Sequence, residues 1–209
     1  MPLEMIPATP ADKASLTEIF YAAFVGDFNR TMFPHTPDVT AWWEHTFHDS
    51  ITRSIAGETD EVFFKIVDSD SDADPDAIAA FAKWKCPTSA DRHRHEPEQP
   101  AEWAPSCDGE LCDQFFSGME QSKAKWMGDR PHYYLDMLAV HPSYQGRGLA
   151  SRLLKWGLER ADREGVEVYL SSSPEGRPVY EKYGFRFLES SSPFPGYEQV
   201  CMLRPVKGQ

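Results

Sequence analysis

Hydrophobic and polar residues follow two different spacings along the chain, and together these predict a mixture of strands and helices. Short runs of branched and aromatic residues predict strands at residues 3–7, 61–67, 77–85, 132–140 and 166–170. Apolar positions three and four residues apart predict helices at residues 9–24, around 42–51, at 110–126 and at 149–164. The pattern therefore predicts an α/β fold, built as a single domain over residues 1–209.

Two polar stretches between these elements are expected to be loops. In residues 26–37, Phe28 and Phe33 are expected either to pack in the core or to line a substrate pocket. Residues 87–109 are rich in Pro, Glu, Ser and His, and we interpret them as a loop insertion within the domain.

Two groups of residues suggest a metal site, but neither has a standard ligand spacing. An EF-hand loop starting at Asp68 would need Gly at its sixth position and Glu at its twelfth, where this chain has Ala73 and Ala79. The candidate zinc ligands are Cys86, His93, His95, Cys107 and Cys112. They form no CxxC or HxxxH pair, so the sequence predicts no metal site.

The charge of the chain limits its partners. It has 21 Lys and Arg against 33 Asp and Glu, a net charge of −12, which argues against nucleic acid and favours a cationic partner such as an amine. The first residues show no secretory signal, and no stretch has the roughly 18 apolar residues of a membrane span. We therefore expect a cytoplasmic protein, with a nuclear location also compatible. Nothing in the pattern indicates an oligomeric state.

A glycine turn joins the predicted strand at 132–140 to the helix that begins at Leu149. Gly146 and Gly148 lack a Cβ, so their amides can approach a ligand closely, and the positive end of the helix dipole favours phosphate or pyrophosphate there. Arg147 adds a positive charge. The alternative is a turn in which Gly is needed only for tight packing. A Rossmann site is rejected because the glycine spacing differs and the turn comes late in the chain.

Two motifs resemble those of the GNAT superfamily of N-acetyltransferases. The first is Gln-x-x-Gly-x-Ala at residues 145–150, which follows the Leu-Ala-Val-His-Pro run at 138–142. The second is the segment from Pro178 to Phe185, with a Tyr four residues before a Gly-Phe pair. The resemblance is strong over residues 133–189. It implies a mixed, mostly antiparallel sheet of six to seven strands flanked by helices and splayed after the strand at 132–140.

The resemblance also implies acetyl-CoA as the co-substrate. Main-chain groups of Leu138, Ala139 and Val140 would hold the pantetheine arm. The amides that would cradle the pyrophosphate belong to Gln145, Gly146, Arg147, Gly148, Leu149, Ala150 and Ser151. Ser173 stands where the family often has Asn, so its expected roles are a pantetheine contact or a cap for a helix opened by Pro174.

Acetyl transfer to an amine needs a base near neutral pH, because a protonated amine has no lone pair. Some family members have a Glu where this chain has Tyr134, so the chain departs from the pattern there. Asp136 is expected on the same face of the strand, and with a raised pKa it would relay a proton. A chain of water molecules is the alternative.

Tyr180 is the expected acid, placed by the resemblance to protonate or hydrogen-bond the departing CoA thiolate. The alternative is a Tyr that only packs in the core. The expected function is an N-acetyltransferase acting on a small-molecule or protein amine by direct attack in a ternary complex. Residues 26–37, the 87–109 insertion and the region near Tyr197 are expected to select the acceptor. A CoA-binding regulatory or interaction module with weak catalysis is the alternative function.

Overall fold

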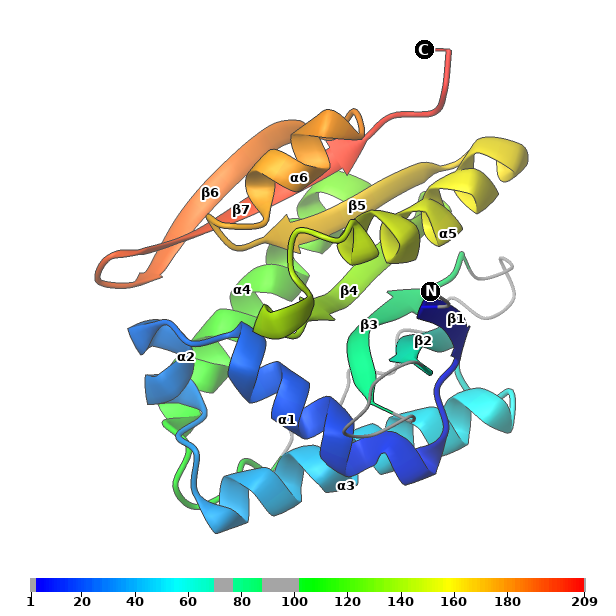
Figure 1. The fold of residues 1–209 in the computed structure, drawn as a ribbon. Coiled ribbons are helices and arrows are strands. Elements are labelled where there is room, and N and C mark those ends of the chain that lie inside the picture. Colours follow the sequence, from blue (N-terminus) through cyan, green and yellow to red (C-terminus); the bar gives the residue numbers. More distant parts are fainter. Residues whose placement is uncertain (1–2, 70–76, 88–101, 209) are drawn as a thin grey trace.

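The computed structural model describes residues 3–69, 77–87 and 102–208, and its centre is a seven-stranded sheet. The strands are β1 (Leu3–Pro7), β2 (Glu61–Asp68), β3 (Ile78–Lys85), β4 (His132–Val140), β5 (Glu167–Ser172), β6 (Arg186–Phe194) and β7 (Tyr197–Arg204). Their order in the sheet is β1-β2-β3-β4-β5-β7-β6, and only β4 and β5 pair in parallel. The predicted mixed, mostly antiparallel sheet is confirmed (Figure 1).

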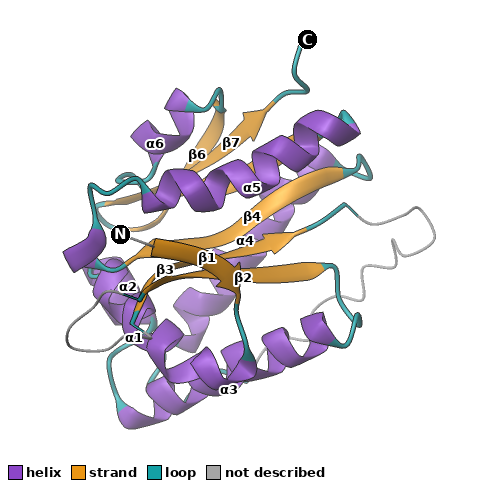
Figure 2. Cartoon of the chain, turned by 45° about the vertical axis from the view of Figure 1, so that its right-hand side comes forward, coloured by secondary structure: helices purple, strands orange, loops and turns teal. Residues whose placement is uncertain are grey.

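Helices cover both faces of this sheet (Figures 1 and 2). The helices are α1 (Lys13–Ala23), α2 (Asp27–Met32), α3 (Pro37–Ile55), α4 (Gly109–Met127), α5 (Leu149–Glu164) and α6 (Arg177–Lys182). One core cluster joins residues of α1, α2, α3 and α4, and a second joins residues of α5 and its side of the sheet. The sheet therefore has an α1–α4 face and an α5–α6 face.

The expected loop at residues 26–37 contains the short helix α2, so that expectation is wrong in part. Phe28 and Met32 lie one turn apart, and each is only 2% exposed, so burial of this pair stabilises a helix of just six residues. The Phe28 ring stacks on Tyr197 with centroids 4.0 Å apart. Phe28 therefore packs in the core, and of the two aromatic residues in this stretch only Phe33 lines the cavity described below.

The expected insertion at 87–109 lies partly outside the described residues, which resume at Glu102. The part that is described is packed: Ala104 is 6% exposed, and Trp42 donates its indole N–H to the Glu102 carbonyl at 2.9 Å. The candidate calcium loop falls largely within residues 70–76, also outside the described residues.

The parallel pair β4–β5 is the irregular part of the sheet. Its last paired residues are Leu135 and Leu170, although β4 continues to Val140 and β5 to Ser172. The strands therefore separate from Leu135 onward, earlier than the sequence predicted. The β3–β4 register also shifts, so that Leu135 and Met137 pair with consecutive β3 residues and Asp136 occupies a β-bulge.

The close contact between α5 and the sheet depends on Gly157. A Cβ built on Gly157 would lie 2.5 Å from the Trp84 ring, and Trp84 is fully buried. We predict that Gly157→Ala lowers the free energy of unfolding by about 1 to 3 kcal/mol, because the buried indole has no room to move. Gly118→Ala in α4 is the matched control, since no atom lies within 4 Å of the added Cβ.

Thermal unfolding of both variants measures this effect. The Tm of Gly157→Ala should fall by roughly 2 to 12 °C, whereas that of Gly118→Ala should stay the same or rise. Equal Tm values for wild type and Gly157→Ala would contradict the packing argument.

Candidate active site

A cavity of about 770 Å³ runs through the sheet where β4 and β5 separate. Its lining on the α5–α6 face includes Ala150, Val179 and Tyr180. Its lining on the α1–α4 face includes Phe33 and Phe116. A molecule bound on one face of the sheet can therefore reach a molecule bound on the other through a gap in the hydrogen bonding.

The glycine turn lies at the α5–α6 end of this cavity. Gly146 and Gly148 have φ values of 76° and 77°, a region that favours Gly, and a Cβ on either would have no atom within 4 Å. The space beside both residues is open, so the alternative of a turn chosen for tight packing is wrong.

The amides that follow this turn are available to a ligand. The first main-chain hydrogen bond of α5 runs from the Arg152 amide to the Gly148 carbonyl. Within the described residues, the amides of residues 146–151 donate to no main-chain carbonyl. Free amides at a helix N-terminus suit an anion.

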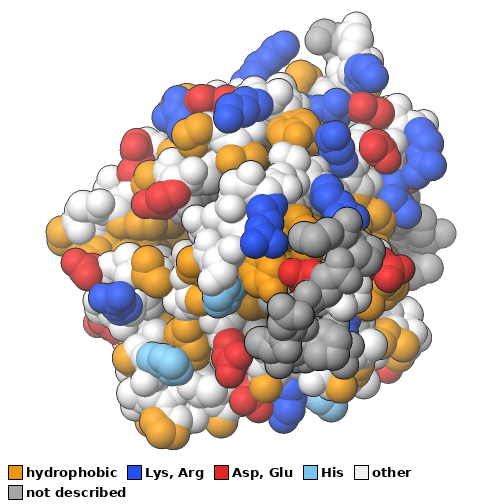
Figure 3. Space-filling view, viewed as in Figure 1, with side chains coloured by type: hydrophobic (Ala, Val, Ile, Leu, Met, Phe, Trp, Pro, Cys, Tyr) orange, Lys and Arg blue, Asp and Glu red, His pale blue; other side chains and the backbone are white. Residues whose placement is uncertain are grey.

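Positive charge surrounds the turn even though the whole chain is acidic. Residues 144–186 hold eight Lys or Arg against six Asp or Glu, while the chain has a net charge of −12. Figure 3 shows Lys and Arg side chains gathered over α5 and α6 in the upper part of that face. The Arg147 guanidinium lies 4.9 Å from the centre of the Tyr144 ring, beside the turn.

Past the point of separation, β4 has a free edge. Leu138, Ala139 and Val140 pair with Ala82, Phe81 and Ala80 of β3. Toward β5 they pair with no strand among the described residues. The Val140 carbonyl accepts a hydrogen bond from the Gln145 side-chain amide at 3.5 Å. The other outward main-chain groups of this edge are available for strand-like bonds to a ligand, and Leu138 also lines the cavity.

Ser173 does not cap a helix opened by Pro174. The helix α6 begins at Arg177, and the Ser173 hydroxyl instead accepts a hydrogen bond from the Gly176 amide at 3.3 Å. This bond stabilises the turn before α6. Ser173 still lines the cavity, so a contact with a bound ligand remains a prediction.

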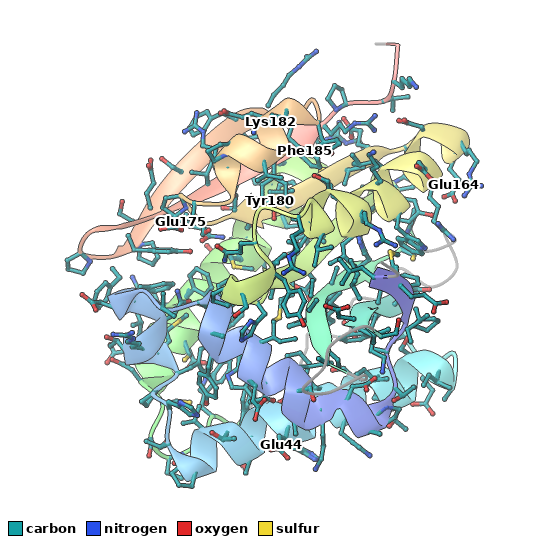
Figure 4. The ribbon with its side chains drawn as sticks, in the orientation of Figure 1. Glu44, Glu164, Glu175, Tyr180, Lys182 and Phe185 are labelled. Atoms are coloured by element: carbon teal, nitrogen blue, oxygen red, sulfur yellow. The ribbon has the colours of Figure 1, made fainter. Side chains whose placement is uncertain are left out.

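Tyr180 lies on the side of α6 that faces α5, as Figure 4 shows. Its ring packs edge-on against Phe185 with centroids 5.8 Å apart, and a Cβ on Gly176 would come within 3.1 Å of it. Burial raises the pKa of the Tyr180 phenol to about 12. The hydroxyl group therefore stays protonated at neutral pH and can donate a hydrogen bond.

The expectation of a raised pKa for Asp136 is wrong. Burial alone would raise it, but the Lys83 ammonium 3.0 Å away and the nearby Lys85 lower the pKa of Asp136 to about 2. Lys83 also pairs with Glu61 at 2.8 Å, so the three side chains form one partly buried charge cluster. A carboxylate this weakly basic does not take a proton from an ammonium ion at neutral pH.

Tyr134 lines the same cavity as Asp136 and is 4% exposed. Burial and the Asp136 charge hold the pKa of its phenol well above the ordinary value. The Lys123 ammonium lies 5.0 Å from the centre of its ring. Tyr134 is thus a neutral phenol and does not supply the carboxylate base that some family members have there.

The sequence reasoning missed Lys83 and Gln199. Lys83 was hidden because its partners Glu61 and Asp136 are far away in the chain. Gln199 is 5% exposed, lines the cavity and accepts a hydrogen bond from the Tyr197 hydroxyl at 2.6 Å. Gln199 could have been recognised from the sequence, because it is a polar residue at a position of the last strand where the side chain points into the protein.

The described parts of the chain contain neither a cluster of metal-ligating residues nor a membrane-spanning helix. Residues 3–69, 77–87 and 102–208 contain no group of three or more His, Cys, Asp and Glu placed to hold a metal ion. Of the candidate zinc ligands, His93 and His95 lie outside these ranges. No described helix is long and apolar enough to cross a bilayer.

Comparisons with known proteins agree with this geometry. A family model described as an acetyltransferase (GNAT) domain matches residues 118–203. A Schizosaccharomyces pombe protein named as an uncharacterized N-acetyltransferase is 32% identical over 90 residues, which are 40% of this chain and 36% of that protein. The match thus spans about a third of the relative's length.

Solved structures show the same fold. A histone acetyltransferase HPA2 and related acetyltransferase from Corynebacterium glutamicum aligns with a TM-score of 0.64 and 22% identity, covering 100% of this chain and 99% of that one. The PaiA N-acetyltransferase from Thermoplasma acidophilum, in complex with coenzyme A, aligns with a TM-score of 0.56 and 14% identity, covering 98% and 99%.

The sheet topology is that of the solved acetyltransferases, and residues 118–203 match the GNAT acetyltransferase domain model. Both motifs that resemble the GNAT superfamily, at residues 145–150 and 178–185, lie within this matched region, which is under half of the chain.

The Asp136–Lys83 pair gives a testable pH dependence. Because the pKa of Asp136 is lower in the folded protein than its ordinary value of 3.8, its contribution to stability is complete above about pH 4 and is lost as the pH falls toward 2. We predict that Asp136→Asn lowers the free energy of unfolding by about 2 to 4 kcal/mol at pH 7, with a smaller loss at about pH 3.

Denaturant unfolding of the variant between about pH 7 and pH 3 measures this loss. Glu44→Gln is the control, because Glu44 forms a more exposed pair with Lys13 at 3.3 Å and lies on α3, outside the cavity lining, at the lower edge of the molecule in Figure 4. Its effect should stay below about 1 kcal/mol. A loss for Asp136→Asn that does not change with pH would contradict the assignment of a low pKa.

Proposed function

We propose that this protein is an N-acetyltransferase that moves an acetyl group from acetyl-CoA to a primary amine by direct attack in a ternary complex, within a single domain. The observation that carries the proposal is the cavity of about 770 Å³ that passes through the sheet between β4 and β5. On the α5–α6 face the cavity opens at a site suited to a donor that carries an anionic group and an extended, peptide-like arm. On the α1–α4 face it widens into a separate chamber. Two substrates entering from opposite faces can meet there, which supports direct transfer.

The donor site rests on main-chain groups. The free edge of β4 at Leu138, Ala139 and Val140 would bond the amides of the pantetheine arm. The amides of residues 146–151 would hold the pyrophosphate at the start of α5, where the helix dipole and Arg147 add favourable charge. The expectation that the Gln145 amide takes part is wrong, because this amide donates to the Pro142 carbonyl at 3.3 Å. The order of these residues along the chain follows the order of the groups in CoA. The residues proposed to hold the pantetheine arm come shortly before those proposed to hold the pyrophosphate, which adjoins that arm.

In the transfer step the neutral amine attacks the thioester carbonyl, the new C–N bond forms and the C–S bond breaks. The low pKa of Asp136 and the neutral phenol of Tyr134 leave neither as an effective base. We therefore assign removal of the amine proton to a water chain. The Asp136 carboxylate, held by Lys83, would orient such water molecules at the mouth of the chamber.

Tyr180 would stabilise the thiolate that leaves. An alkyl thiol such as that of Cys has a pKa near ~8.5, whereas the pKa of Tyr180 is raised to about 12. The phenol is therefore the weaker acid, so it donates a hydrogen bond while the C–S bond breaks and does not lose its proton. The thiolate is finally protonated by the proton that the amine has released.

A CoA-binding module with weak catalysis is the less favoured alternative. Its support was the missing Glu at Tyr134. The protonated Tyr180 hydroxyl and a chamber that reaches the reaction point both favour turnover.

The glycine turn gives a test of donor binding. We predict that Gly148→Ala weakens binding of acetyl-CoA by about tenfold or more, because the added methyl group projects into the open space beside the amides. Gly57→Ala is the control, since Gly57 has a similar φ of 72° and equally open surroundings at the end of α3.

Both variants should lose about 1 to 2 kcal/mol of stability from the left-handed backbone. Calorimetric titration with acetyl-CoA and thermal unfolding separate the two effects. Equal loss of affinity in both variants, or none in Gly148→Ala, would place the donor elsewhere.

Replacing Tyr180 tests the proposed role of its hydroxyl group in the release of the thiolate. In a CoA-thiol release assay with acetyl-CoA and a primary amine, we predict that Tyr180→Phe lowers kcat roughly 10- to 100-fold with little change in the KM for acetyl-CoA. Because the pKa of Tyr180 is near 12, its ionisation should produce no loss of wild-type activity up to about pH 10.

Tyr183→Phe is the matched control, because Tyr183 lies outside the cavity lining at the end of α6. Its kcat should remain near that of wild type. An unchanged kcat in Tyr180→Phe at every pH would remove Tyr180 from the mechanism, and no thiol release from wild type with any amine would overturn the proposed activity.

A further inference from the structure

The chamber on the α1–α4 face is lined by an unusual density of aromatic rings. Six rings of the cavity lining form what we call the aromatic wall: Phe24, Phe33, Trp43, Trp103, Phe115 and Phe116. From this wall we infer that the acceptor is a primary amine that carries an aromatic ring. The inference rests on the proposed function, and it names the class of amine that the chamber takes.

The wall is held in a fixed arrangement before any substrate arrives. The Trp103 ring stacks on Phe116 with centroids 5.4 Å apart, and Phe116 contacts Phe115 edge-on at 5.2 Å. Phe33 lies edge-on to Trp43 at 5.0 Å. The Trp103 indole donates a hydrogen bond to Asp113 at 2.8 Å, which fixes its plane. Such a set of faces and edges suits one more ring.

The charged side chains of the chamber are already paired. Asp136 bonds Lys83, Glu120 bonds Lys123 at 2.7 Å, and Asp113 accepts from Trp103. A polyamine or amino sugar would need additional carboxylates or other polar groups in place of the rings. The net charge of the chain suggests a cationic acceptor, but two of the acidic residues that line the chamber, Asp136 and Glu120, are neutralised by Lys side chains. Asp113 accepts from the neutral Trp103 indole and keeps its single negative charge, which suits a monoamine better than a polyamine.

The chamber has room for such a substrate. A cavity of about 150 Å³ is enough for a benzene ring, and the cavity through the sheet measures about 770 Å³. With its ring against Phe116 and Trp103, an arylalkylamine would direct its amino group toward the gap beside Asp136, where the donor thioester arrives. Figure 3, drawn in the view of Figure 1, shows hydrophobic side chains along a recess on the left of the molecule, between the β6–β7 end and α2.

A longer acyl group on the donor is the competing occupant of this wall. The donor site lies on the α5–α6 face, whereas the wall is built from the residues that end α1 and α2, from α3 and α4, and from the segment before α4. A short acetyl group ends at the gap and leaves the wall to the acceptor. The acceptor is therefore the favoured occupant, and the experiment separates the two.

The first experiment compares amines with saturating acetyl-CoA in the thiol-release assay, using the whole chain. We expect kcat/KM for 2-phenylethylamine to exceed that for ethylamine, spermidine and glucosamine by at least roughly tenfold, because the ring alone contributes the contacts with the wall. Equal or higher kcat/KM for spermidine or glucosamine would overturn the inference and leave the proposed function standing.

The second experiment alters the wall. Phe116→Ala should raise the KM for 2-phenylethylamine at least roughly tenfold, while the KM for ethylamine and the KM for acetyl-CoA change less than about threefold. Phe116→Leu keeps much of the volume, should fold in any case, and should give an intermediate KM. Phe187→Ala is the control, because this ring is 49% exposed on β6 and lies outside the cavity lining.

Two further outcomes would overturn the inference. If Phe116→Ala changes the KM of both amines equally, the wall does not select the ring. If wild type prefers hexanoyl-CoA to acetyl-CoA and Phe116→Ala abolishes that preference, the wall holds the acyl group. Binding of acetyl-CoA without turnover of any amine would instead remove the proposed function itself, and the inference with it.

Discussion

The separation of β4 and β5 is the constraint on which the rest of this structure depends. Each strand remains bonded to its outer neighbour, β3 for β4 and β7 for β5, but beyond Leu135 and Leu170 the two are not bonded to each other. Unpaired main-chain groups inside a fold are costly unless a polar partner satisfies them. The gap is therefore a position where a peptide-like ligand is more favourable than protein alone, and the cavity, the free edge and the glycine turn all adjoin it.

The bulge at Asp136 determines which groups can take part in proton transfer. It places this carboxylate beside Lys83, and the pairing keeps Asp136 ionised but weakly basic. Tyr180 has no such charged partner among the causes of its shift, and burial raises the pKa of its phenol to about 12, so it keeps its proton. The two side chains thus have fixed protonation states around neutral pH, which is why the mechanism we propose moves the proton through the substrate amine and water.

Elements with a strong local pattern were predictable from the sequence, and contacts between distant segments were not. The strand at 132–140 and the α5 helix closing at Gly165 follow from their own residues. The helix α2 was missed because six residues carry too little periodicity, and its stability comes from burying Phe28 against Tyr197. The pKa of Asp136 depends on Lys83 of another strand, and the aromatic wall is assembled from five separate segments.

The uneven distribution of charge has a consequence for how the donor finds its site. Basic side chains gather over α5 and α6, while the rest of an acidic chain repels anions. The proposed CoA donor is polyanionic, so this field would turn it and guide it to one end of the molecule before any contact forms, as in other electrostatically steered encounters. The aryl amine that we propose as acceptor carries a single charge and would feel this field weakly, so ionic strength would act on the arrival of the donor and hardly on that of the acceptor.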